Sequence, residues 1–183
     1  MAFVELPVER ANRLINHGPT VLVTSKYQEK ANIMTAAWCM PTSHNPPMVA
    51  VSIGVTRFSH ELILKSSEFA INVPHSKLLR EMWCCGTKSG RTNDKFSLCG
   101  LTPVAGKHIQ APLIGECLGA IECRLESHPT AGDHSIMVGQ VLAVWSKPGV
   151  FDDRLRVEKV DAQTLHHLGG KDFCTPGKIV KIQ

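Results

Sequence analysis

Arginine and hydroxyl side chains gather where an apolar stretch ends. Residues 48–53 (MVAVSI) are followed within a few residues by Arg57, Ser59 and His60. A guanidinium group forms strong hydrogen bonds to phosphate or carboxylate oxygens, and the free N–H groups at a helix start add to them. Arg57 and Ser59 therefore form one candidate anion site. The alternative is an exposed arginine beside an ordinary helix-capping serine.

A second candidate anion site lies in a polar loop further along the chain. The sequence SGRTNDKF places Ser89 and Gly90 before Arg91 and Lys95. Glycine lets the backbone adopt conformations that bring it close to a ligand, and the two cations supply charge. These residues could bind a phosphate or form a solvated polar loop, and the pattern alone does not separate the two.

Small side chains mark a place where a flat ligand could approach the backbone. A strand predicted over residues 32–38 is unusual in having them where a packing strand would carry large ones. The small residues are Thr35, Ala36 and Ala37, and Asn32 and Met34 of the same strand belong to the candidate site. Ser52, a hydroxyl near the end of the strand predicted over residues 48–53, completes this candidate site. The alternative is a strand packed beneath a helix.

His134 is the remaining candidate for chemistry. It follows Gly132 and Asp133 in a turn that leads into the apolar stretch SIMVGQVLAV. The alternative is a turn histidine that lies in water. The other histidines and the seven cysteines show no spacing typical of a zinc site, so we expect no metal.

Composition narrows the class of protein. The chain has 183 residues and a net charge of +4 with scattered basic residues, which argues against nucleic-acid binding. Residues 31–56 carry no charged side chain, but Pro41, Pro46 and Pro47 interrupt them, so we expect no membrane span. The acidic residues near the N-terminus do not fit a signal peptide, which predicts a cytoplasmic protein with reduced thiols.

Short strands dominate the elements that must position these residues. Residues 21–25 and 32–38 predict one hairpin, and residues 117–128 and 134–144 a second one across the turn PTAGD. Residues 69–73 predict another strand, and the prolines after Trp38 predict a turn leading to residues 48–53. The helices expected are a segment over residues 9–16, one capped by Ser59, one capped by Ser76, and a helical turn from Asn93 and Asp94. The pattern predicts a mainly β domain with a few short helices, spanning residues 1–183.

An ordered set of motifs also resembles a known family. NIMTAAW, VSIG, RFSHE, INVP, SGRTNDKF, LTP and GDH occur in this order over most of the chain. The set is similar to that of the flavin reductase-like, FMN-binding split β-barrel family, and within it to the flavoredoxin branch. The resemblance implies that Arg57, Ser59, Ser89, Arg91 and Lys95 help to hold FMN. It implies that His134 lies at the nicotinamide side of the flavin.

The resemblance also implies a function. A homodimer would pass electrons from NAD(P)H, or from a redox partner protein, through the flavin to an acceptor. The alternatives are a non-enzymatic FMN carrier and a reductase of ferric complexes that uses the same flavin. A flavin-free ligand-binding or thiol–metal module is the alternative from another class, for which the cysteines are the only support.

Overall fold

The computed structural model describes residue 7, residues 12 and 15, and residues 18–182. The helix predicted over residues 9–16 therefore lies almost entirely outside the described residues. No helix in the described part of the chain is long and apolar enough to cross a membrane.

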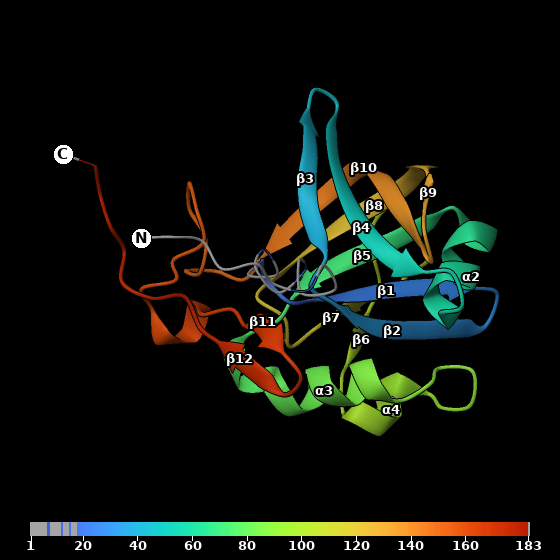
Figure 1. Ribbon diagram of the computed structural model, residues 1–183, viewed down its shortest axis with the longest axis horizontal. Coiled ribbons are helices and arrows are strands. Elements are labelled where there is room, and N and C mark those ends of the chain that lie inside the picture. The colour runs from blue at the N-terminus through green and yellow to red at the C-terminus, as the bar shows by residue number, and fades with distance from the viewer. Residues whose placement is uncertain (1–6, 8–11, 13–14, 16–17, 183) are drawn as a thin grey trace.

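One antiparallel sheet forms the body of the molecule (Figure 1). Its strands follow the order β2-β1-β5-β8-β10-β4-β3, and β9 pairs with β10. Their bounds are β1 Val21–Tyr27, β2 Lys30–Ala36, β3 Cys39–His44, β4 Pro47–Gly54, β5 Glu68–Val73, β8 Gly119–Ser127, β9 Thr130–Ala131 and β10 His134–Ser146. Strands β2 and β3 end this order on its two sides. The sheet as a whole confirms the predicted mainly β fold.

Both predicted hairpins are confirmed. Strand β1 pairs with β2 from Val21 opposite Ala36 to Tyr27 opposite Lys30, which leaves a two-residue turn. Strand β10 pairs with β8 along its second half and with β4 along its first half. Because β10 lies between them, the Gly132–Asp133 turn delivers His134 directly opposite Gly54 of β4.

The predicted proline-rich turn is wrong in one respect. Residues Cys39–His44 form strand β3, which pairs antiparallel with β4, and only the short segment around Asn45 and Pro46 turns the chain. Proline lacks an N–H donor, which normally argues against a strand. Here Pro41 lies on an edge strand beside a register shift, where the missing donor leaves no ladder bond unmade.

Three short helices flank the sheet within residues 18–182, and two of the caps near them differ from the prediction. They are α2 Phe58–Ser66, α3 Leu79–Thr87 and α4 Lys95–Cys99. Arg57, not Ser59, occupies the N-cap of α2, and Ser59 lies within its first turn. His75, not Ser76, caps the short 3₁₀ helix η2 Ser76–Leu78 that precedes α3. The predicted helical turn is confirmed, because the Asp94 side chain accepts a hydrogen bond from the N–H of Phe96 at the start of α4.

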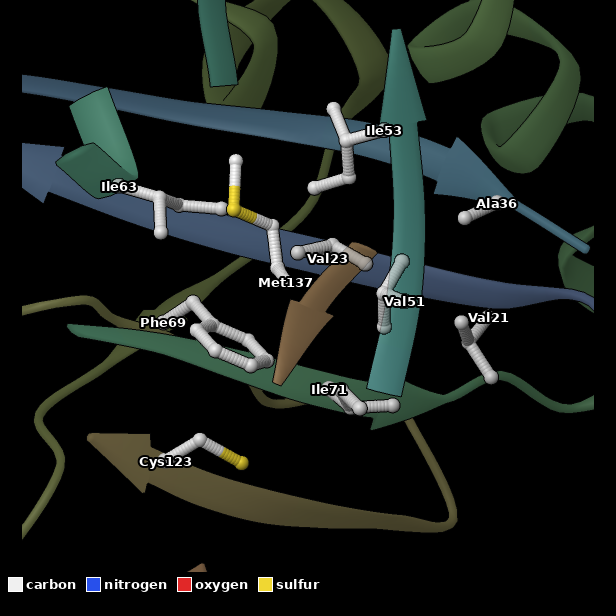
Figure 2. Packing of buried hydrophobic residues seen from close by; sticks show 10 residues of the cluster. All are labelled: Val21, Val23, Ala36, Val51, Ile53, Ile63, Phe69, Ile71, Cys123 and Met137. Atoms are coloured by element: carbon white, nitrogen blue, oxygen red, sulfur yellow. The ribbon is translucent and has the colours of Figure 1, made fainter. Parts of the chain in front are cut away.

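The main core is enclosed by strands of the sheet, and α2 adds Ile63 to it (Figure 2). Phe69 of β5, Met137 of β10 and Ile63 of α2 meet there and are fully buried. A Cβ at Gly139 would lie 2.6 Å from the Phe69 ring, so β10 can cross this aromatic ring only without a side chain at that position. A second cluster packs α3 and α4 against the other side of β1 and β2.

The remaining segments are small additions. The pairs are β6 Pro103–Val104 with β7 Leu113–Ile114, and β11 His166–Gly169 with β12 Asp172–Cys174. The short 3₁₀ helix η3 Val160–Ala162 precedes β11. The two-stranded β11–β12 hairpin was not expected from the glycine-rich sequence of the C-terminal segment.

Candidate functional site

A cavity of about 510 Å³ lies where β2, β4, α2 and α3 approach one another. The loop at residues 88–94, the start of β10 and the β11 strand contribute the rest of its wall. Every site residue predicted from the sequence lines this one cavity. They are Asn32, Met34, Thr35, Ala36, Ala37, Ser52, Arg57, Ser59, Ser89, Gly90, Arg91, Lys95 and His134.

The strand with small side chains forms one wall, as predicted. Helix α3 packs closely against it, because a Cβ at Gly86 would lie 3.3 Å from Cβ of Thr35. The Thr35 hydroxyl donates a hydrogen bond to the carbonyl oxygen of Met82. The wall is thus fixed between sheet and helix while its small side chains leave the backbone accessible to a flat ligand.

The first predicted anion group meets Asn32 inside the cavity. The Asn32 amide donates to the Ser59 hydroxyl over 2.8 Å, whereas its oxygen Oδ1 is buried without a hydrogen-bond partner among the described residues. A half-turn of the amide would let Ser59 donate instead and would turn the NH₂ group to the unpartnered position. A buried polar atom without a partner is costly. The Gly90 loop covers this atom, so Asn32 positions Ser59 and does not itself offer an open position to a bound ligand.

Arg57 is available to such a ligand. Its guanidinium makes no hydrogen bond and no ion pair with the described residues. His60, which follows in the sequence, does not share the cavity, because its Nε2 lies 2.9 Å from the Ser135 hydroxyl. The helix geometry separates Arg57 from His60. Arg57 is the N-cap of α2, whereas the His60 side chain projects from a different face of the helix than Ser59.

The second predicted anion group forms the opposite wall. A Cβ at Gly90 would lie only 1.9 Å from Oδ1 of Asn32, so the loop can close over Asn32 only because residue 90 is glycine. The backbone N–H of Arg91 donates to the Ser89 hydroxyl. The close contact between Gly90 and Asn32 brings the residues of both predicted anion groups to one cavity.

Arg91 already has a protein partner. Its guanidinium donates to Glu61 over 2.6 Å and lies 5.0 Å from the centre of the Phe58 ring. Hydrogen bonds from Lys65 and from Arg91 lower the pKa of Glu61. Arg91 therefore contributes a cation whose position is fixed by α2, which the loop sequence alone could not indicate.

Lys95 is buried instead of lying free in the loop. It is 4% exposed, and its Nζ donates to the carbonyl oxygens of Ile33 and Cys85, each over 2.7 Å. Burial is the main cause that lowers the pKa of Lys95, and the charge of Arg57 acts in the same direction. An ammonium group has three N–H donors, so one remains. Two cations that raise each other's energy favour an anion between them.

His134, the first residue of β10, also lines the cavity. Its Nδ1 is 2.7 Å from a carboxylate oxygen of Asp133, and its ring centre is 5.1 Å from that of Trp38. The hydrogen bond with His134 lowers the pKa of Asp133. Because a carboxylate only accepts, Nδ1 carries a proton, which leaves Nε2 for a ligand.

Several cavity residues were missed by the sequence reasoning. They are Asn12, Trp38, Gly54, Thr56, Phe58, Cys85, Gly86, Thr87, Lys88 and His167. Trp38 directly follows the small residues and could have been included on that ground. His167 comes from the β11 strand, far away in the sequence, and no local pattern pointed to it.

Comparison with known proteins identifies the family. The model of the flavin reductase like domain matches residues 13–166. The chain belongs to the flavin reductase-like family. The YddH protein of Escherichia coli (strain K12) is 37% identical over 97% of this chain and 97% of its own. The NADH-dependent FMN reductase AsuE2 of Streptomyces nodosus subsp. asukaensis is 28% identical over 90% of this chain and 84% of its own.

Solved structures agree with this assignment. The flavoredoxin of Desulfovibrio vulgaris (Miyazaki F) superposes with a TM-score of 0.81 and 28% identity, covering 91% of this chain and 90% of its own. The flavin reductase-like split barrel is thus the fold of this chain, as the motif set implied.

The cavity fits what a flavin reductase-like domain has to hold. FMN combines a phosphate, a polar ribityl chain and a flat ring whose edge carries hydrogen-bonding groups. The Arg57 guanidinium, which has no protein partner among the described residues, suits a phosphate. The small side chains of β2 leave room for the flat ring beside exposed backbone groups.

Proposed function

We propose that the protein binds FMN in this cavity and moves electrons from NAD(P)H through the flavin to an acceptor. The carrying observation is that one cavity unites both anion groups with the small-residue strand and His134. The name of the similar protein AsuE2, an NADH-dependent FMN reductase, supports the nicotinamide as reductant. The whole chain, residues 1–183, would act as one such domain in the cytoplasm.

The residues divide the work by their chemistry. Arg57 and Ser59 would hold the phosphate, with Asn32 positioning Ser59 and with Ser89 and Arg91 closing over it. Residues Met34 to Ala37 would present backbone groups to the edge of the ring, and Ser52 a hydroxyl. When bound, the flavin supplies the capacity to take up a hydride and pass electrons on. The chain positions it and places Nε2 of His134 where a nicotinamide nucleotide would dock.

A visible absorption spectrum tests the proposal most directly. Protein that is incubated with FMN and then freed of excess ligand by gel filtration should retain flavin absorbance at about one FMN per chain. Protein without flavin absorbance after this treatment would refute the proposed function.

Replacing His134 with alanine should slow the reduction of bound FMN by NAD(P)H at least tenfold, which corresponds to roughly 1.4 kcal/mol of barrier. The reason is that Nε2 would no longer help to dock the nicotinamide nucleotide, whose amide and phosphates accept hydrogen bonds. Stopped-flow absorbance measures the rate.

Two controls separate this role from others. FMN affinity and reduction by dithionite should stay near those of the unmodified protein. If the variant loses FMN instead, His134 belongs to the flavin-binding set and its proposed role is wrong. His44 lies on the β3–β4 hairpin outside the cavity, so His44→Ala is the matched control variant.

A non-enzymatic electron carrier is the second candidate. The similarity to a flavoredoxin favours it. Turnover with NAD(P)H alone separates the two functions: bound FMN that neither nicotinamide reduces within minutes would establish the carrier and leave His134 as a turn residue.

We also propose a homodimer. Several large apolar side chains are exposed on the chain, among them Met40 (59%), Val144 (68%) and Trp145 (43%). Burying such side chains on a second copy would stabilise an assembly by about 25 cal/mol per Å² of apolar surface. Light scattering at micromolar concentration should give twice the mass of the chain, and a monomer that still holds FMN would contradict the dimer.

A further inference from the structure

A second cavity adjoins the first one at the turn of the β1–β2 hairpin. Its volume is about 410 Å³, and it lies between this turn and helix α2, which are neighbours in Figure 1. Phe58 and Arg91 line both cavities, so these two side chains form the boundary between them. The proposed function gives this second cavity no ligand.

Two aromatic rings line the second cavity, and each has a cation over it. The Lys65 ammonium lies 5.8 Å from the centre of the Tyr27 ring, and the Arg91 guanidinium lies 5.0 Å from the centre of the Phe58 ring. Tyr27 is 37% exposed at the end of β1. A flat heteroaromatic base stacks on such a ring, and the neighbouring cations suit a ligand that also carries phosphate.

One carboxylate holds both of these cations. Glu61 accepts a hydrogen bond from Lys65 over 2.7 Å and one from Arg91 over 2.6 Å. These hydrogen bonds lower the pKa of Glu61, so its carboxylate is ionised at neutral pH. A carboxylate that lines a nucleotide cavity can accept hydrogen bonds from ribose hydroxyl groups. The cavity therefore has a partner for each part of a nucleotide: base, ribose and phosphate.

The hairpin turn adds a group that can recognise the base. Gln28 lines the cavity, and its side chain has no hydrogen-bond partner among the described residues. A glutamine amide both donates and accepts, which matches the amino group and the adjacent ring nitrogen of adenine. Adenine is therefore the base that these residues suit.

We propose that the second cavity is an adenylate subsite, which takes the adenosine 5′-phosphate part of a dinucleotide. This inference rests on the proposed function. The adenine would stack on Tyr27, and Glu61 would accept hydrogen bonds from the ribose. Arg91 would contact the phosphate groups, because it lines both cavities and closes over the proposed FMN phosphate.

Two ligands carry an adenylate group that could occupy this subsite. In FAD the adenylate is joined to the FMN phosphate itself, so it would extend from the first cavity past Arg91 into the second. In NAD(P)H the adenylate is the end of the molecule that is remote from the nicotinamide. The adenylate is the chemistry that both share, and separate measurements distinguish the two sources.

Tyr27→Ala tests the subsite with both ligands. In the first measurement, isothermal titration calorimetry should show at least fivefold weaker FAD binding, with FMN binding within twofold of the unmodified protein. In the second, stopped-flow absorbance follows the reduction of bound FMN. The variant should need at least fivefold more NADH or NADPH for half the maximal rate, while the maximal rate stays the same. A response in the first assigns the subsite to FAD, and a response in the second assigns it to the nicotinamide dinucleotide.

Matched variants make the outcome decisive. Tyr27→Phe keeps the ring and should behave like the unmodified protein. Leu64→Ala is the control for a surface change, because Leu64 is 38% exposed on α2 and lines neither cavity.

Two results would overturn the adenylate subsite. If Tyr27→Ala changes neither measurement, or weakens FAD and FMN equally, the subsite is refuted, while FMN binding to the unmodified protein leaves the proposed function standing. If the unmodified protein binds neither FMN nor FAD, the proposed function fails, and the subsite that rests on it fails as well.

Discussion

Arg57→Ala should weaken FMN binding by about 1.5–3 kcal/mol, which is the value of a hydrogen bond to a charged group. The guanidinium is free of partners within the described part of the chain and lines the cavity beside the Ser59 and Asn32 pair. Its removal therefore takes away a ligand contact and breaks no contact within the protein. Fluorescence titration of FMN measures the change.

Riboflavin makes this test specific. Because it lacks the phosphate, its affinity should hardly respond to Arg57→Ala. Arg80→Ala, an exposed arginine on α3 away from the cavity, is the matched control and should leave both affinities unchanged. Equal losses for FMN and riboflavin would show that Arg57 does not bind the phosphate.

Lys95→Met should lower the free energy of unfolding of the flavin-free protein by about 2–5 kcal/mol. The methionine fills much of the same volume but takes the ammonium donor away from the carbonyl oxygens of Ile33 and Cys85. Each buried carbonyl without a partner costs about 1–3 kcal/mol. Urea denaturation followed by circular dichroism measures the loss.

Lys88→Met provides the comparison, because Lys88 lines the same cavity but is exposed and has no side-chain partner among the described residues. Its unfolding free energy should change by no more than about 0.5 kcal/mol. If Lys95→Met is equally harmless, the two hydrogen bonds add nothing to stability, and the lysine acts on the ligand alone.

Local patterns predicted the hairpins, and the residues that they singled out for a site line one cavity. Alternation and turn residues act over a few positions, so the β1–β2 and β8–β10 pairs were readable from the sequence. The Arg57 and Ser59 group was singled out because polar residues that directly follow a buried strand lie near the end of that strand. These patterns say little about partners that are distant in the sequence.

The wrong expectations concern residues whose environment is set by a contact that is distant in the sequence. Lys95 looked like a loop cation, but β2 and α3 bury it by offering two carbonyl acceptors. Arg91 looked free, but Glu61 and Phe58 hold it. Strand β3 was missed because its prolines oppose a strand in isolation, whereas pairing with β4 on one side only makes them harmless. None of these partners can be chosen from spacing alone.

The absence of pairing between β2 and β4 has a consequence for how FMN would change local opening of the sheet. Strand β2 is the first of the ordered strands, and no ladder joins it to β4 in the described part of the chain, although both line the cavity. A flavin that contacts both strands would bridge them. Any local movement of β2 away from β4 would then require the flavin to dissociate first. Amide hydrogen exchange in β2 and β4 should therefore become slower as the FMN concentration rises. At a concentration one hundred times Kd, the free energy of local opening should increase by about 2.7 kcal/mol. Exchange in β5 and β8, which contribute no residue to the cavity, should respond only through global unfolding.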